Sequence, residues 1–266
     1  MEPGVVAMNV GRVFVVASNV FREVIRDRIL YLIGFFALAL VAIAALLPHV
    51  TANTQDKILL DVGLAAIGIA GLVSTVFVGT GLVNKEIEKR TVFVLIAKPV
   101  RCSEFILGKH LGLSTLLAVL LASMTVIYFI VLSLNQVSYP VGSIIVSVVY
   151  LLLELSLITA VAILFGVFTS SLLATVLTFA VYLMGHFSRD LVELGRLADS
   201  PAIERVTETA YLILPDLSRL NFRNEAVYGF DVMPSAGELV SNAVYGVVYA
   251  VLLLAIATIV FSRREF

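Results

Sequence analysis

The chain has 266 residues, of which 60% are hydrophobic and 14% charged, and its formal net charge is −1. A soluble domain normally carries about 25% charged residues, so the composition excludes an ordinary water-soluble fold and predicts an all-α polytopic membrane protein. The absence of excess positive charge argues against a nucleic-acid partner. The single cysteine, Cys102, excludes an intrachain disulfide and a cysteine-based zinc site.

Charged residues interrupt segment 1–28, which is therefore predicted to form an interfacial helix and not a membrane span. Apolar side chains between Val10 and Ile25 fall on one face at helical spacing, and Arg12 and Arg22 fall on the other. A helix of this kind lies in the headgroup plane with its apolar face toward the lipid. A simple membrane anchor would show the same pattern.

Six apolar stretches approach the length of about 20 residues that a membrane helix needs. They predict a single transmembrane domain over residues 1–266, with spans at about 29–50, 60–83, 111–134, 142–168, 172–188 and 236–261. The fourth and fifth spans come from one long apolar run, which we expect to fold back at Thr169-Ser170-Ser171. Glycine and serine are frequent in the second span, which predicts a close contact with another helix or subunit.

Lysine and arginine mark the cytoplasmic side of membrane proteins. With six spans, segments 1–28 and 84–110 and the C-terminal tail lie on one side, and together they hold twelve lysines and arginines. The segment 189–235 on the opposite side has more acidic than basic residues. The charge pattern therefore predicts that both termini and segment 84–110 are cytoplasmic, and that segment 189–235 is extracytoplasmic.

Segment 84–110, called the connector below, joins the second and third spans. It opens with the charged cluster Lys85–Arg90 and continues with an apolar stretch that Pro99 ends. Ser103 is predicted to cap the next helix, with Glu104 in its first turn. The pattern predicts a short cytoplasmic helix, a proline turn and then the third span, although an ordinary charged loop has a similar composition.

The segment 189–235 carries its own helix signals. Ser200-Pro201 predicts the start of a helix, and Pro215 predicts its end. We expect this helix to lie on the outer membrane surface or over a pore mouth. Ser235 and Glu238 form a capping-box pattern that opens the last span.

The connector resembles the signature of ABC-2 type permeases, the membrane subunits of type-2 ATP-binding-cassette exporters. The matching residues are Glu86-x-Glu88-Lys89-x-Thr91, Lys98-Pro99-Val100, Glu104 and Gly108-Lys109. Phe165–Ser170 resembles the family's turn between spans four and five. Leu214–Phe222 resembles the stretch before the last span in the branch often labelled multicopper enzyme maturation permeases.

The resemblance implies a coupling helix that docks on a separate ATPase subunit. The residues that it places at this contact are Glu86, Glu88, Lys89, Arg90, Thr91, Pro99 and Arg101. It also implies two ATPase copies, a second permease half that is identical or paralogous, export as the direction, and the cytoplasmic (inner) membrane of a prokaryote. The helices before the last span would form an external gate.

The sequence has no P-loop, no dinucleotide-binding glycine motif and no hydrolase or zinc-protease motif, so ATP hydrolysis is expected in the partner and no cofactor is expected here. Glu154 within the fourth span and Asp61 at the start of the second are the intramembrane polar candidates. They leave open an ion- or proton-coupled secondary transporter or channel that acts through them, and a noncatalytic membrane scaffold is a separate alternative. Glu154 can equally be a packing contact, and Asp61 an interfacial residue.

Overall fold

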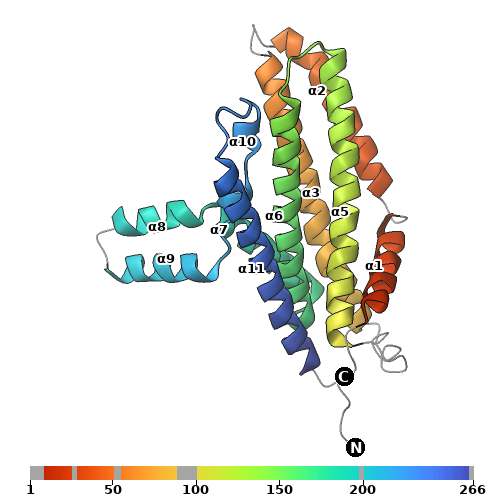
Figure 1. Ribbon diagram of the computed structural model, residues 1–266, viewed down its shortest axis with the longest axis vertical. Helices are drawn as coiled ribbons and strands as arrows, with labels where there is room; N and C mark the ends of the chain where they lie inside the picture. The colour runs from red at the N-terminus through yellow and green to blue at the C-terminus, as the bar shows by residue number, and fades with distance from the viewer. Residues whose placement is uncertain (1–8, 26–28, 51–54, 89–100, 198–200, 264–266) are drawn as a thin grey trace, which may run out of the picture.

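The computed structural model describes residues 9–25, 29–50, 55–88, 101–197 and 201–263. These residues form helices and connecting turns with no strand among them, which confirms the predicted all-α class. In chain order the helices are α1 (Val10–Ile25), α2 (Ile29–Val50), α3 (Gln55–Glu88), α5 (Cys102–Leu134), α6 (Val141–Phe168), α7 (Ser171–His186), α8 (Ser188–Leu197), α9 (Pro201–Ile213), the short 3-10 helix η1 (Leu217–Leu220), α10 (Arg223–Ala226) and α11 (Ala236–Ser262) (Figure 1).

Four of the described helices are long and apolar enough to cross a membrane, namely α3, α5, α6 and α11. A fifth span is formed only if α7 and α8 are counted together, because the chain bends by 64° between them. The apolar part of α2, Tyr31–Leu47, is shorter than the apolar stretches of the four long helices. The described helices therefore support four to five spans, and the six expected from the sequence are not all established.

The turn between α6 and α7 lies where the sequence predicts it. Helix α6 ends at Phe168 and α7 begins at Ser171, so the chain reverses through Thr169 and Ser170. The backbone N–H and the hydroxyl of Thr169 both donate to the carbonyl of Phe165, at 2.9 and 2.8 Å. These bonds satisfy an end-of-helix carbonyl inside an apolar environment, where an unpaired backbone group would be costly.

Helix α7 ends two residues before the predicted span does, at a place where the chain packs closely against it. A Cβ atom placed on Gly185 would lie 2.8 Å from the carbonyl oxygen of Pro215, so the segment before η1 approaches α7 at a residue without a side chain. The hydroxyl of Ser188 donates to the carbonyl of Gly185 at 3.1 Å. The helix stops at His186, and α8 leaves in a new direction.

Helix α6 lies at the centre of the bundle and contacts α3, α5, α7 and α11. Several of its side chains, among them Leu155, Leu157 and Ile158, are fully buried. Lipid tails are as apolar as these side chains, so helices in a membrane associate through close packing and hydrogen bonds more than through the hydrophobic effect. One such bond joins α5 to α3, where the hydroxyl of Tyr128 donates to the carbonyl of Leu60 at 2.9 Å.

Glycines on α3 allow the close packing that the sequence predicts. Gly63 lies directly against the ring of Tyr128 on α5. A Cβ atom on Gly71 would be 2.5 Å from a methyl group of Leu155, and one on Gly79 would be 3.1 Å from the Cβ atom of Ala162, both on α6. The prediction that this helix makes a close helix–helix contact is confirmed, and its partners are α5 and α6 of the same chain.

The segment between α7 and α11 begins with a pair of helices that leaves the bundle sideways. Helices α8 and α9 pack against each other and stand out from the side of the bundle (Figure 1). Helix α9 starts at Pro201 and ends at Ile213, as predicted, and the Ser235–Glu238 capping box at the start of α11 is confirmed. Apolar side chains such as Val206 and Leu212 remain exposed on this pair.

Candidate functional site

Those residues expected to contact an ATPase that the structure describes lie at one end of the bundle, which we call the connector end. Helix α3 ends at Glu88, so the backbone of Glu86 and Glu88 lies in its last turn, and α5 begins beyond Arg101 at the same end (Figure 1). Arg101 is exposed. The other expected contact residues, Lys89, Arg90, Thr91 and Pro99, lie outside the described residues.

Helix α5 begins earlier than expected, because Glu104 caps its first turn. Its carboxylate accepts the backbone N–H of Arg101 at 3.1 Å, so Arg101 is the N-cap residue, and the prediction that Ser103 has this role is wrong. A carboxylate that reaches back to the N-cap N–H is half of a capping box, and it also favours the positive end of the helix dipole.

Glu104 also joins α1 to α5. One of its oxygens accepts the backbone N–H of Asn9 at 2.8 Å, just before α1, and the other lies 3.8 Å from the guanidinium of Arg12. The Glu104 side chain is fully buried. A buried carboxylate with charge-assisted partners is costly to disrupt, so this residue holds the starts of α1 and α5 together at the connector end.

Helix α1 lies along α5 and follows its direction. Its residues Val13 and Val16 approach Gly108, and its residues Ala17 and Val20 approach Gly112. The amphipathic helix predicted for segment 1–28 is therefore present, but part of its apolar face is buried on α5. The two glycines, four residues apart, form a groove of the kind that lets membrane helices pack closely.

The two intramembrane polar candidates lie in different surroundings. Asp61 is exposed near the start of α3, consistent with an interfacial residue. Glu154 is 0% exposed in the middle of α6, and one of its oxygens lies 3.5 Å from Nε2 of His186 at the end of α7. The sequence indicates Glu154 but not this partner, because the contact depends on α7 ending at His186.

A third charged group reaches toward the same region. The guanidinium of Arg223 lies directly against Gly68 of α3, in space that any larger residue would fill. Its Nε donates to the side-chain oxygen of Asn221 at 2.8 Å, and its charge acts on both Glu154 and His186. The sequence analysis did not predict a role for Arg223. The available signal was the glycine in α3, which leaves room for a charged side chain from a distant segment.

Asp216 organises the turn between α9 and η1. Its carboxylate accepts from Arg189 at 2.8 Å, from Arg219 at 3.1 Å and from the hydroxyl of Ser218, and its N–H donates to the hydroxyl of Tyr245. Burial raises the pKa of Asp216, but the hydrogen bonds from Ser218 and the two arginines outweigh it, and the net pKa lies below the ordinary value.

Protonation of Asp216 is expected to loosen this turn. Its pKa is lower in the folded protein, so its contribution to stability is complete above about pH 4 and is lost as the pH falls through the native pKa. We expect Asp216→Asn to cost about 2 kcal/mol and to speed amide hydrogen exchange in residues 211–222 at neutral pH. Exchange unchanged from the wild type would contradict the assignment, and Asp231→Asn, at an exposed position, is the matched control.

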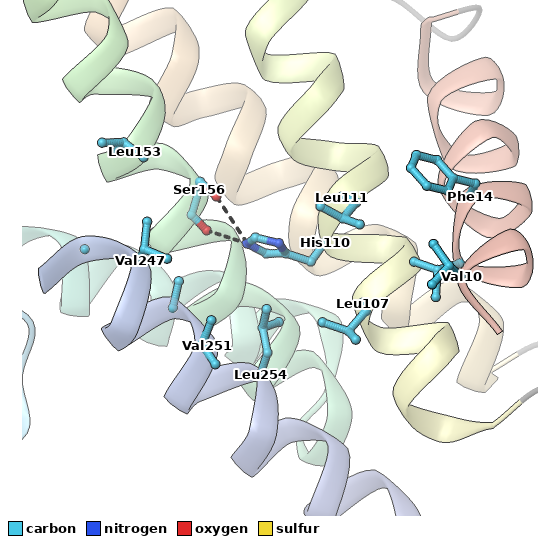
Figure 2. A pocket seen from close by; sticks show the side chains of 13 residues that line it. Val10, Phe14, Leu107, His110, Leu111, Leu153, Ser156, Val247, Val251 and Leu254 are labelled. Atoms are coloured by element: carbon cyan, nitrogen blue, oxygen red, sulfur yellow. Dashed lines mark hydrogen bonds between the residues drawn. The ribbon is translucent and has the colours of Figure 1, made fainter. Parts of the chain in front are cut away.

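An apolar cavity of about 460 Å³ lies between α1, α5, α6 and α11 (Figure 2). Phe14, Leu107, Leu153 and Val251 are among the side chains that line it. Its polar side chains pair with each other, because Nε2 of His110 lies 3.0 Å from the carbonyl oxygen of Ser156 and 3.3 Å from the hydroxyl of Ser156. The cavity presents no charged side chain and is suited to an apolar molecule.

Comparison with known proteins identifies one family. A family model described as ABC-2 family transporter protein matches residues 14–266, which is nearly the whole chain and includes most of α1, the connector and the bundle. No curated protein matches the chain.

Proposed function

The chain belongs to the ABC-2 transporter family, and from that premise we propose that it exports a cargo with energy from a separate ATPase subunit. As a member of this family it is a membrane permease. Nearly the whole chain matches the family, so the assignment covers the connector as well as the spans. The ATPase, the direction of transport and the site of coupling are the parts that we propose.

The proposed arrangement has six spans in one transmembrane domain over residues 1–266. Helix α2, with 22 residues, and the bent α7–α8 pair supply the two spans that complete the four long helices. With six spans, the lysine-rich connector and both termini face the cytoplasm of a prokaryotic cell, and segment 189–235 faces outward.

The observation that carries the proposal is the placement of the helices on either side of the connector. Helix α3 ends and α5 begins at the same end of the bundle, so a subunit that binds the connector acts on both helices at once. We infer that Glu86, Glu88, Lys89, Arg90, Thr91, Pro99 and Arg101 form this contact.

A movement at the connector would reach the rest of the bundle through the contacts already described. Helix α1 would follow α5, because Glu104 bonds to the backbone of Asn9 and the two helices meet at Gly108 and Gly112. Helix α3 would act on the central α6 through Gly71 and Gly79. Packed interfaces of this kind transmit displacement because they deform little.

We further propose that two such chains, or this chain and a paralogue, assemble with two ATPase copies. Wide apolar sides of the bundle support a second permease half. Helix α11, for example, exposes Val244, Val248 and Leu252 by 54 to 61%. A membrane-embedded apolar face can be covered by lipid or by a partner helix, and a dimer would cover part of it.

Purification in mild detergent tests the proposal. The tagged full-length chain is expected to bring down a P-loop ATPase, and that ATPase is expected to hydrolyse ATP faster in the complex than alone. A chain that purifies without any ATPase from the cells that naturally express it would overturn the proposed function.

A further inference from the structure

Three titratable side chains from separate helices approach one another inside the bundle. They are Glu154 of the central α6, His186 at the end of α7 and Arg223 at the start of α10. Glu154 is 0% exposed, and neither of its carboxyl oxygens has a hydrogen-bond partner among the described residues. Nε2 of His186 is likewise buried without a hydrogen-bond partner, 3.5 Å from Glu154 Oε1.

The second nitrogen of His186 determines what Nε2 can do. Nδ1 lies 3.1 Å from the carbonyl oxygen of Tyr182, which can only accept a hydrogen bond, so Nδ1 carries a hydrogen. In the neutral imidazole, Nε2 is then an acceptor that faces the carboxyl group of Glu154. Glu154 in its ionised form would also be an acceptor, and two acceptors would face each other.

One proton placed between Oε1 and Nε2 removes this conflict. It can be held as O–H···N by a neutral acid and a neutral imidazole, or as N–H···O by an imidazolium and a carboxylate. In either form it gives a partner to two atoms that otherwise lack one. A buried carboxylate without a donor is costly, so the site has a physical reason to hold the proton.

Arg223 is the charged residue that could compete with a proton as the partner of Glu154. Its Nε bonds to Asn221 and its guanidinium lies against Gly68, and the charge acts on Glu154 without a direct ion pair being formed. The other titratable groups that act on the pair are Tyr182 of α7 and Asp216 before η1. Among the described residues no group of three or more His, Cys, Asp or Glu side chains could hold a metal ion, and the two facing groups fit a single proton.

We propose that Glu154 and His186 form an intramembrane site that binds one proton between them. The proton comes from a hydronium ion in the adjoining water: one O–H bond of the hydronium breaks, a water molecule is left behind, and one new bond forms at a lone pair of the site. Its loss leaves a carboxylate that attracts Arg223 more strongly, so proton occupancy sets how firmly the start of α10 is held against the bundle. The inference stands on these contacts and does not depend on the proposed ATPase.

Solid-state NMR on the full-length chain in lipid vesicles tests the site directly. With ¹⁵N-labelled histidine and ¹³C-labelled glutamate, the signals of His186 and Glu154 are expected to change together with pH, at a common midpoint, because a shared proton titrates the pair as a unit. His110 is the internal control, because it pairs with Ser156 on the other side of α6. Separate midpoints for His186 and Glu154 in the wild-type chain would overturn the proposal.

Glu154→Gln gives a second readout, because it removes the shared proton and nearly preserves the volume. We expect it to shift the His186 midpoint by about tenfold or more in proton concentration and to leave the His110 signal in place. An exposed thiol next to Arg223, made by Asn224→Cys in a Cys102→Ser background, is labelled faster as the pH rises because more thiolate forms. Once this ordinary rise is subtracted, its labelling is expected to change with pH only while Glu154 is present. A His186 midpoint unmoved by Glu154→Gln would contradict the shared site.

Discussion

Gly112→Leu is expected to detach α1 from α5 and to destabilise the protein by about 3 kcal/mol, near the upper end of the usual cost of overpacking. A Cβ atom at Gly112 would lie 2.7 Å from the carbonyl oxygen of Ala17 and 2.8 Å from Cβ of Val20. The first of these is a backbone atom, so no side-chain rotation can relieve the clash. Helix α1 would have to move away as a whole.

Distances between spin labels on the two helices measure this effect. In a Cys102→Ser background, labels at Phe14→Cys on α1 and Thr115→Cys on α5, both exposed positions, are expected to give a narrow distance distribution before Gly112→Leu is introduced and a broad, longer one after it. Gly34→Leu on α2 is the matched control, because no atom lies within 4 Å of a Cβ placed there. An unchanged distribution in Gly112→Leu would show that α1 does not depend on this groove.

Glu86→Lys combined with Glu88→Lys is expected to abolish binding of the ATPase subunit. The change reverses two charges at the proposed contact, and like charges placed against each other at an interface cost several kcal/mol, which weakens binding by more than about a hundredfold. The amount of ATPase that co-purifies with the tagged chain is the measurement, and transport driven by ATP should fall with it.

The same number of charges reversed elsewhere serves as the control. Glu193→Lys and Glu208→Lys change the net charge equally, at exposed positions on the α8–α9 pair. They are expected to leave ATPase binding unchanged, because this pair is proposed to lie on the opposite side of the membrane. Equal binding by the wild type and the Glu86/Glu88 variant would show that the connector is not the contact.

Features governed by local sequence could be predicted. The turn at Thr169–Ser170 follows from a polar triplet in a long apolar run, and the start of α9 follows from proline at its first position. The capping box at Ser235 is also local. The glycines of α3 indicated close packing, although the sequence did not say which helices would meet them.

Features that depend on distant residues could not be predicted. The length of α7 is limited by the chain near Pro215, which reaches Gly185 from thirty residues away. Arg223 lies beside Gly68 for a similar reason, since neither residue alone indicates that this half-buried side chain packs there. The N-cap residue of α5 is Arg101 and not the expected Ser103, because one carboxylate oxygen of Glu104 accepts the N–H of Arg101. The other oxygen of Glu104 accepts the N–H of Asn9.

The proposed ATPase contact is tested most directly by finding the side of the membrane on which the connector lies. In a Cys102→Ser background, Lys98→Cys places a single thiol in the connector for labelling with a membrane-impermeant maleimide. We predict no reaction in intact cells, full reaction in inside-out vesicles, and protection in those vesicles once the ATPase subunit is bound. Reaction from outside intact cells would contradict a cytoplasmic connector. Labelling that bound ATPase does not reduce would contradict binding of the ATPase subunit to the connector.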